Sequence, residues 1–155
     1  MSLDKKKVVD AILNRLDEDL ALAVAAAERA RETATSKENI AENKYDTLGL
    51  EAAYLAHGQS NRAQRLAEEK LAFAALSLDR QEEVSLGALV SIKNANDKSK
   101  WIFVGPGAAG LTLEIEGQEF VVVTPDSPLG VGLRGLSVDD ATTVNDIDLE
   151  ILDLL

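Results

Sequence analysis

The sequence lacks cysteine altogether and contains few histidines, prolines and aromatic residues. Without cysteine the chain has no disulfides, thiolate metal sites or cysteine nucleophiles. With His57 as its single histidine, it offers no convincing Ser/His/Asp catalytic set. Aromatic residues make up 4% of the 155 residues, whereas 46% are hydrophobic, and many of these are alanine. Because alanine buries little area, we expect a thin or elongated core rather than a large enzyme core with a deep pocket.

Positive charge is also scarce. The formal net charge is −11, from 16 Lys and Arg against 27 Asp and Glu. DNA phosphates repel such a chain, so we expect no binding to duplex DNA through a basic face. Docking onto a basic protein surface, or holding a cation, is compatible with this charge. The apolar run near the start, residues 20–27, is far shorter than the ~20 residues that span a bilayer. With no signal peptide recognised, we expect a cytoplasmic protein without a membrane partner.

Glycine and proline divide the chain into two halves. Between residues 4 and 80 there are two glycines and no proline, whereas the other eight glycines and all three prolines follow. We therefore predict two domains, residues 1–80 and residues 84–155, joined by a short charged connector.

The first half has the heptad spacing of two packed helices. One seam consists of Val9, Leu13, Leu16, Leu20, Ala23, Ala27, Ala30 and Ala34, and the other of Tyr45, Gly49, Ala53, Ala56, Ser60, Ala63 and Ala67. Both alternate spacings of four and three, and the second shifts register near Leu71 and Ala74. Small residues at adjoining ends let two helices pack closely. We predict an antiparallel coiled-coil hairpin that turns near residues 35–39, with two unrelated surface helices as the alternative.

The second half alternates with a period of two, which is typical of strands. Strands are expected at residues 84–92, 101–104, 111–115, 120–123 and 147–151, and residues 127–136 are expected to form a short helix or a glycine-interrupted loop. Four or five strands around one short helix predict a small, β-rich α+β domain.

Three segments resemble the GreA/GreB family of bacterial transcription elongation (transcript-cleavage) factors. The most specific, residues 123–140, is similar to the family's strand, Ser-Pro and short helix ending in a Leu-x-Gly-x-x-Val-Gly-Asp turn. The matching residues there are Leu133, Gly135, Val138 and Asp140, with Asp139 in place of the family's second glycine. Residues 101–105 resemble a strand ending in Val-Gly. Residues 42–45 resemble the Ser-Glu-Asn-Ala-Glu-Tyr signature at the family's coiled-coil tip, one residue shorter.

The resemblance implies an FKBP-like second domain and an accessory factor that binds RNA polymerase, rather than an enzyme. In the family the hairpin tip enters the polymerase channel, where an Asp and a Glu help to hold Mg²⁺ and water. The polymerase then hydrolyses its own backtracked RNA. A helix of about 30 residues is roughly 45 Å long, enough to enter such a channel. The resemblance also implies that Ser127, Pro128 and Leu129 bind the polymerase.

At the tip this sequence departs from the family's pattern. Aligned on Glu42, the family's Asp falls at Asn39, a neutral amide, and Glu38 stands next to it at i,i+4 from Glu42. The resemblance thus makes Glu38, Asn39 and Glu42 the candidate catalytic tip. Glu38 and Glu42 would be metal ligands only jointly with the polymerase Mg²⁺ site, with no cofactor bound by the chain alone. The nascent RNA 3′ end would be met only within the polymerase complex.

Three other interpretations stay open. Asn39 favours a competitor or inhibitor that occupies the channel without stimulating cleavage. The alanine seams would also suit a plain interaction module that dimerises through its hairpin, and Glu38 and Glu42 could then be ordinary solvated charges. A prolyl isomerase would be suggested by fold analogy alone, and the second domain has only three aromatic residues for such a pocket.

Overall fold

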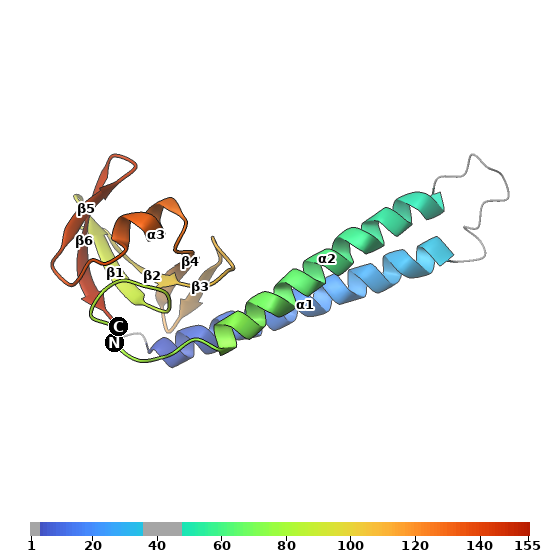
Figure 1. The fold of residues 1–155 in the computed structure, drawn as a ribbon, viewed down its shortest axis with the longest axis horizontal. Coiled ribbons are helices and arrows are strands. Elements are labelled where there is room, and N and C mark those ends of the chain that lie inside the picture. The colour runs from blue at the N-terminus through green and yellow to red at the C-terminus, as the bar shows by residue number, and fades with distance from the viewer. Residues whose placement is uncertain (1–3, 36–47) are drawn as a thin grey trace. The chain divides into compact units, whose positions relative to one another are not determined.

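The structure is a computed structural model that describes residues 4–35 and 48–155 (Figure 1). The elements are α1 (Lys5–Thr35), α2 (Leu48–Ala74), β1 (Leu89–Asn94), β2 (Ser99–Val104), β3 (Thr112–Ile115), β4 (Gln118–Val123), α3 (Pro128–Leu133), β5 (Ala141–Val144) and β6 (Ile147–Leu154). They form two compact units. Residues 14–70 are called the hairpin unit below, and residues 1–13 with 71–155 are called the sheet unit.

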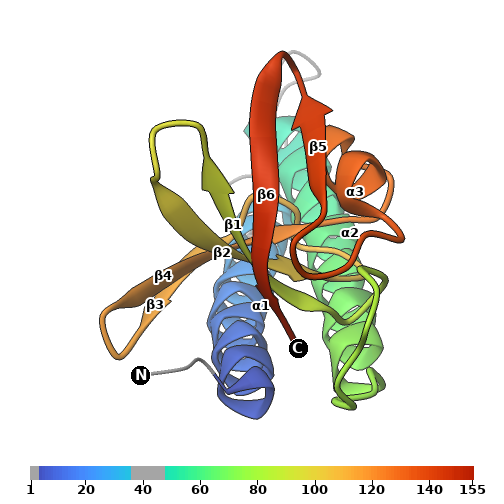
Figure 2. The same cartoon turned by 90° about the vertical axis from the view of Figure 1, so that its left-hand side faces the viewer.

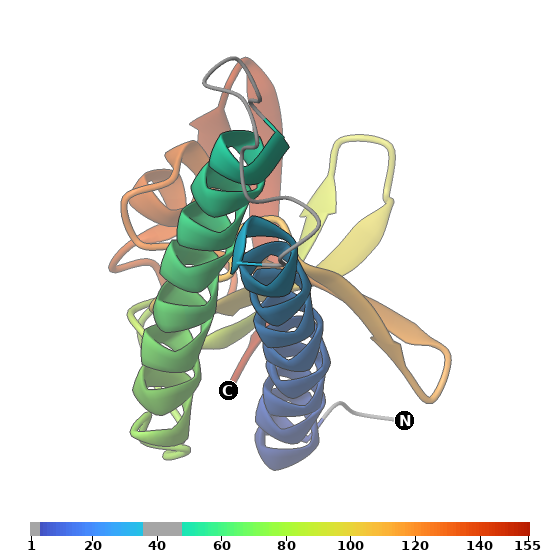
Figure 3. The same ribbon diagram turned by 90° about the vertical axis from the view of Figure 1, so that its right-hand side faces the viewer.

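In the hairpin unit two long helices run side by side in opposite directions (Figures 1 and 3). The helix α1 has 31 residues and α2 has 27, and an ion pair of 2.5 Å between Lys70 Nζ and Asp17 Oδ1 joins them. The prediction of two long antiparallel helices is confirmed, whereas their description as a coiled coil stays a prediction. Beyond Thr35, the predicted turn at residues 35–39 lies outside the described residues.

The buried stripe of the hairpin unit follows the predicted first seam. Leu16, Ala23, Ala27 and Ala30 are all buried on α1, and Ala56 is buried on α2. Further along α2, the predicted shift of the second seam to Leu71 and Ala74 is wrong. Leu71 is 72% exposed and Ala74 is exposed, whereas the two buried residues are Leu66 and Phe73, which stand one heptad apart. The interior positions in this part of α2 therefore follow the heptad that contains Leu66 and Phe73, not the register shift predicted near Leu71 and Ala74.

The sheet unit contains a six-stranded mixed sheet with the order β3-β4-β2-β1-β6-β5 (Figure 2). Only β2 and β4 are parallel, and β1 and β6 shift register between Ser91 and Ile92. The α+β class is confirmed, with six strands instead of four or five. The FKBP-like description stays a prediction. Strand β5 has no counterpart among the predicted strands, because two of its four residues are exposed and two are half-buried at the sheet edge, which leaves a weak pattern.

Both faces of the central strands are buried. One face joins a hydrophobic core with α3, formed by Val84, Ala88, Val90, Ile92, Ile102, Val104, Leu133, Ile151 and Leu154. On the other face Phe73, at the end of α2, stacks on Phe103 of β2 with ring centroids 6.2 Å apart. Phe103 is fully buried, and so is Leu89. Burial on two faces explains why Leu89 and Ser91 of β1 are buried together with Val90 and Ile92.

The predicted strand 84–92 begins only at Leu89. Residues before it form turns. Val84 exchanges backbone hydrogen bonds with the segment after α3, donating to Leu136 and accepting from Gly135. Leu86, which lies within the predicted strand, is in one of these turns and is 45% exposed. The apolar period of two thus extends past the strand into a segment held by non-local contacts.

Within the sheet unit, two lysines hold the first turns of α1 against other segments of that unit. Lys5 is buried, and its Nζ donates a 2.7 Å hydrogen bond to the backbone oxygen of Asp79. Lys7 Nζ lies 2.9 Å from Glu116 Oε1, in the turn between β3 and β4. Burial lowers the pKa of Lys5, partly offset by attraction to Asp79, whereas the hydrogen bond to Glu116 raises the pKa of Lys7.

Candidate functional site

Helix α3 is started by a serine cap. Ser127 has extended backbone angles, its Oγ accepts a 3.0 Å hydrogen bond from Gly130 N, and the hydroxyl donates a 2.6 Å bond to Thr124 O. Pro128 follows at the start of the helix, where its missing N–H costs nothing and its fixed φ suits the first turn. The Ser-Pro pair therefore explains why a helix begins at this point.

The helix lies so close to its neighbours that side chains would not fit at two positions. A Cβ at Gly130 would lie 2.0 Å from Thr124 O, and one at Gly132 would lie 2.4 Å from Val144 Cγ2. Glycine therefore lets α3 lie directly against β5 (Figure 2) and against Thr124, the residue after β4.

The turn after α3 has a strained backbone position. Asp139 has φ +74°, a conformation that glycine adopts most easily. Its amide donates to Ile151 O, and the amide of Ile151 donates back to Asp140 O, both at 2.9 Å. Asp140 Oδ2 also accepts a 2.8 Å bond from Ser137 N. The turn is thus fixed to β6, and Asp139 stands where the GreA/GreB resemblance leads one to expect glycine.

A groove of about 470 Å³ opens between α3, the sheet and the β5–β6 hairpin. Its lining residues are Ile92, Asn94, Lys98, Ser99, Lys100, Val123, Ser127, Pro128, Leu129, Val144, Asn145, Ile147 and Leu149. The predicted polymerase-binding residues Ser127, Pro128 and Leu129 all contribute to it. The structure thereby brings those three side chains to one apolar hollow, although their role stays a prediction.

The charge of the groove is opposite to that of the chain. Two lysines, Lys98 and Lys100, are among the described residues that line it, and no Asp or Glu is. Both are exposed, and neither is joined to a carboxylate by an ion pair within residues 4–35 and 48–155. Sequence reasoning missed these lysines, since they flank one serine at the start of an ordinary strand.

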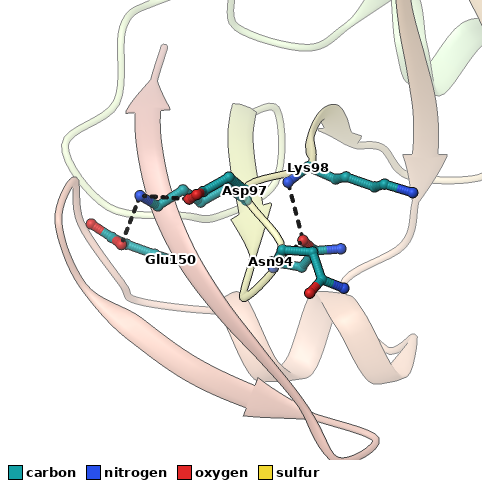
Figure 4. Close-up of polar contacts among 6 residues, drawn as sticks. Asn94, Asp97, Lys98 and Glu150 are labelled. Carbon is teal, nitrogen blue, oxygen red and sulfur yellow. Dashed lines mark hydrogen bonds and ion pairs between the residues drawn. The ribbon is translucent and has the colours of Figure 1, made fainter.

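The carboxylates nearest to the turn before β2 form ion pairs with Lys93. Lys93 Nζ lies 3.7 Å from Asp97 Oδ1 and 3.5 Å from Glu150 Oε2. Asn94 Oδ1 accepts backbone hydrogen bonds from Asn96 and Lys98, which closes the turn that the sequence predicts. Figure 4 shows the side chain of Lys98 extending away from Asp97 and Glu150. The amine of Lys98 is therefore turned away from the nearest acids drawn there.

The candidate tip residues Glu38, Asn39 and Glu42 lie outside the described residues, so their geometry stays a prediction. In the part of the chain that the structure describes, no group of three His, Cys, Asp or Glu is placed to hold a metal ion. His57 is exposed, with Nε2 3.4 Å from Asn61 Nδ2. Across the same described ranges, no helix combines the length and apolar character needed to cross a bilayer.

Comparison with family models and with curated proteins gave no match to this chain. Among solved structures, the chain is similar to GreA factor homolog 1 (Gfh1) of Thermus thermophilus, at 17% identity and a TM-score of 0.39, over 92% of this chain and 94% of that one. It is similar to Gfh1 of Thermus aquaticus at 19% identity and a TM-score of 0.40, over 97% of this chain and 94% of that one. It is also similar to a structure described as the transcription factor Gfh1, at 19% identity and a TM-score of 0.40, over 99% of this chain and 95% of that one. Identity and TM-score are low, so function is inferred below from the residues of this chain.

Proposed function

We propose that this protein is an accessory factor of GreA/GreB type that binds RNA polymerase. The observation that carries the proposal is the conformation of residues 123–140. Their sequence resembles the family's strand, Ser-Pro, helix and turn, and they fold as the end of β4, a Ser127 cap, α3 and a turn at Asp139 with φ +74°. A backbone that favours glycine, at the position where the family has glycine, supports the alignment independently of residue identity.

The proposal gives each unit a separate task. The groove beside α3, with Ser127, Pro128 and Leu129 on its wall, docks on the rim of the polymerase channel. The two-helix hairpin, as a coiled coil within residues 1–80, enters the channel, and residues 84–155 form an FKBP-like domain. A pair of long helices suits a narrow channel, because it is far thinner than a globular domain.

At the hairpin tip, Glu38 and Glu42 would help to hold an Mg²⁺ ion that belongs mainly to the polymerase. Carboxylate oxygens suit this ion, which keeps several waters and takes few protein ligands. Bound there, Mg²⁺ supplies an activated water for hydrolysis of backtracked RNA. The neutral amide of Asn39 adds no charge. Two carboxylates at i,i+4 are therefore what this chain contributes, and the remaining ligands come from the polymerase.

A second function is favoured by Asn39. Without the family's Asp at that position, the hairpin would occupy the channel and exclude other factors without stimulating cleavage. Both functions require binding to polymerase, so they differ only in what happens at the tip.

The two functions are separated by a cleavage assay on stalled, backtracked polymerase complexes, with binding measured in parallel. For a stimulator, Glu42→Ala should lower cleavage on the order of a hundredfold, as is typical when one electrostatic group is removed from such a site. Glu38→Ala should lower it less, and Asn39→Asp should raise it. Binding should stay unchanged in all three variants, since the substitutions do not touch the groove.

If the wild type and Asn39→Asp both bind polymerase without enhancing cleavage, the proposed stimulation of cleavage is wrong and the function as a channel competitor is supported. If the folded wild type does not bind polymerase at all, both functions are wrong.

A further inference from the structure

The groove beside α3 combines an apolar floor with a cationic rim. Ile92 is 1% exposed at its base, and Val123, Leu129, Val144 and Leu149 are partly buried around it. A hollow of about 470 Å³ is large enough for a leucine- or phenylalanine-sized side chain together with part of its backbone. The floor therefore selects an apolar anchor, and the rim decides what may flank that anchor.

The rim carries two positive charges that the fold leaves unneutralised. Lys98 and Lys100 stand two residues apart at the start of β2, and they line the groove together with neutral Ser99. Lys93, which lies on the other side of the turn, is engaged by Asp97 and Glu150 and is not available. The described lining of this groove thus carries positive charge and no acid, in a chain of net charge −11.

We infer that the groove receives a partner segment in which an apolar side chain is flanked by carboxylates, with those carboxylates pairing with Lys98 and Lys100. The inference rests on the proposed function in taking that segment to belong to RNA polymerase. The acidic remainder of this chain would repel an acidic partner elsewhere on its surface, so the pairing would select both the place and the orientation of docking.

The charge preference is tested first with synthetic peptides on the full-length, ¹⁵N-labelled protein. Three short helical peptides share one leucine, which is flanked by glutamates, by glutamines or by lysines. The glutamate peptide should shift the amide signals of Ile92, Lys100 and Val144 saturably, the glutamine peptide should bind more weakly, and the lysine peptide should not bind. The inference is wrong if the lysine peptide binds as tightly as the glutamate peptide, or if the glutamate peptide shifts none of these signals.

The second arm measures affinity for purified RNA polymerase. Lys98→Glu with Lys100→Glu should weaken binding by about tenfold or more and reduce its salt dependence, because attraction becomes repulsion. Lys6→Glu is a control for one of the two charge reversals, since Lys6 is an exposed lysine of the sheet unit that does not line the groove. Lys6→Glu should bind like the wild type.

The outcomes separate the inference from the proposed function. If the wild type binds polymerase and the double variant binds equally well, the charge assignment is wrong and the proposed function stands. If the wild type does not bind polymerase, the proposed function is wrong, and the peptide arm alone decides the preference of the groove. Sedimentation of the wild type and of the double variant tests whether a second copy of this chain occupies the groove instead. A dimer that the double variant dissolves would assign the groove to a second copy of this chain and overturn the inference.

Discussion

The hairpin unit and the sheet unit are built from different side chains. The buried α1 positions of the hairpin unit are Leu16 and three alanines, whereas the sheet unit buries phenylalanine, isoleucine, leucine and valine completely. A buried phenylalanine removes several times more apolar area from water than a buried alanine. Packing therefore stabilises the sheet unit. The hairpin unit depends more on the helix propensity of its alanines and on pairs such as Lys70 with Asp17.

The difference fits the proposed division of labour, in which the sheet unit docks and the hairpin unit enters a channel. A docking domain gains from a rigid core that holds its groove in shape, whereas a probe that enters a channel gains from being thin. Small interior residues let two helices approach each other, and the cost is low stability per residue. Substitutions in the two units should consequently differ in how much they change stability and in how far along the chain the change extends.

The largest effect is expected at the end of α2. Phe73→Ala removes a fully buried ring that stacks on Phe103 and should lower the free energy of unfolding by about 3–5 kcal/mol. Urea unfolding followed by the fluorescence of Trp101, which is half-buried in β2, measures it. Leu71→Ala is the control, because Leu71 is 72% exposed, and it should change stability by less than ~0.5 kcal/mol. Equal effects of the two variants would contradict the packing described for this unit.

A smaller and more local effect is expected in the hairpin unit. Ala25→Gly, at an exposed position of α1, should cost about 1 kcal/mol through helix propensity alone. Ala27→Gly should cost about 0.8 kcal/mol more, because it also removes a buried methyl group. Amide hydrogen exchange should show faster opening within residues 14–35 and unchanged exchange in β1 and β2. Equal costs at the two positions would mean that the alanine seam contributes nothing by burial.

The turn after α3 should respond in opposite directions at adjacent residues. Asp139→Gly should stabilise the protein by ~0.5–1 kcal/mol, since it relieves a φ of +74°. Asp140→Gly should destabilise it by about 1 kcal/mol, because Asp140 Oδ2 accepts from Ser137 N. Thermal unfolding of both variants measures the pair. A loss of stability in Asp139→Gly would show that its side chain makes a contribution larger than the backbone strain.

The smallest effects concern Lys5 and Lys7, which hold the first turns of α1 in place within the sheet unit. The pKa of Lys7 is raised above 10.5, so its contribution to stability is present below pH 10.5 and is lost as the pH rises through the folded-state pKa. The pKa of Lys5 is lowered, so the cost of burying its charge disappears as the pH rises toward 10.5. NMR titration of the two side chains should find Lys5 titrating before Lys7. Glu116→Gln should return the pKa of Lys7 toward its ordinary value and leave that of Lys5 unchanged. If the pKa of Lys7 is the same in Glu116→Gln as in the wild type, the contact between Lys7 and Glu116 is contradicted.

Local patterns predicted the elements whose causes are local. The scarcity of glycine and the absence of proline, together with heptad spacing, were sufficient to predict α1 and α2. For residues 127–136 a short helix and a loop were both expected, and the helix α3 is what forms there. What the sequence did not predict depends on contacts between distant residues. Phe73 is interior because Phe103 lies against it, and β1 begins late because turns tied to the segment after α3 occupy residues 84–88. The same holds for the site. Ser127, Pro128 and Leu129 were found by resemblance, but Lys98 and Lys100 joined them only through the fold.

The central claim, that the groove beside α3 docks on RNA polymerase, is tested most directly by one affinity measurement. Wild type is compared with the combined variant Ser127→Ala, Pro128→Ala, Leu129→Ala for binding to purified polymerase, after circular dichroism has shown that the variant is folded. Val131→Ala is the control, because Val131 is a 62% exposed residue of the same helix that does not line the groove. We predict saturable binding of the wild type and of Val131→Ala, and a loss of about tenfold or more in the combined variant. Unchanged affinity in a folded combined variant would contradict the claim.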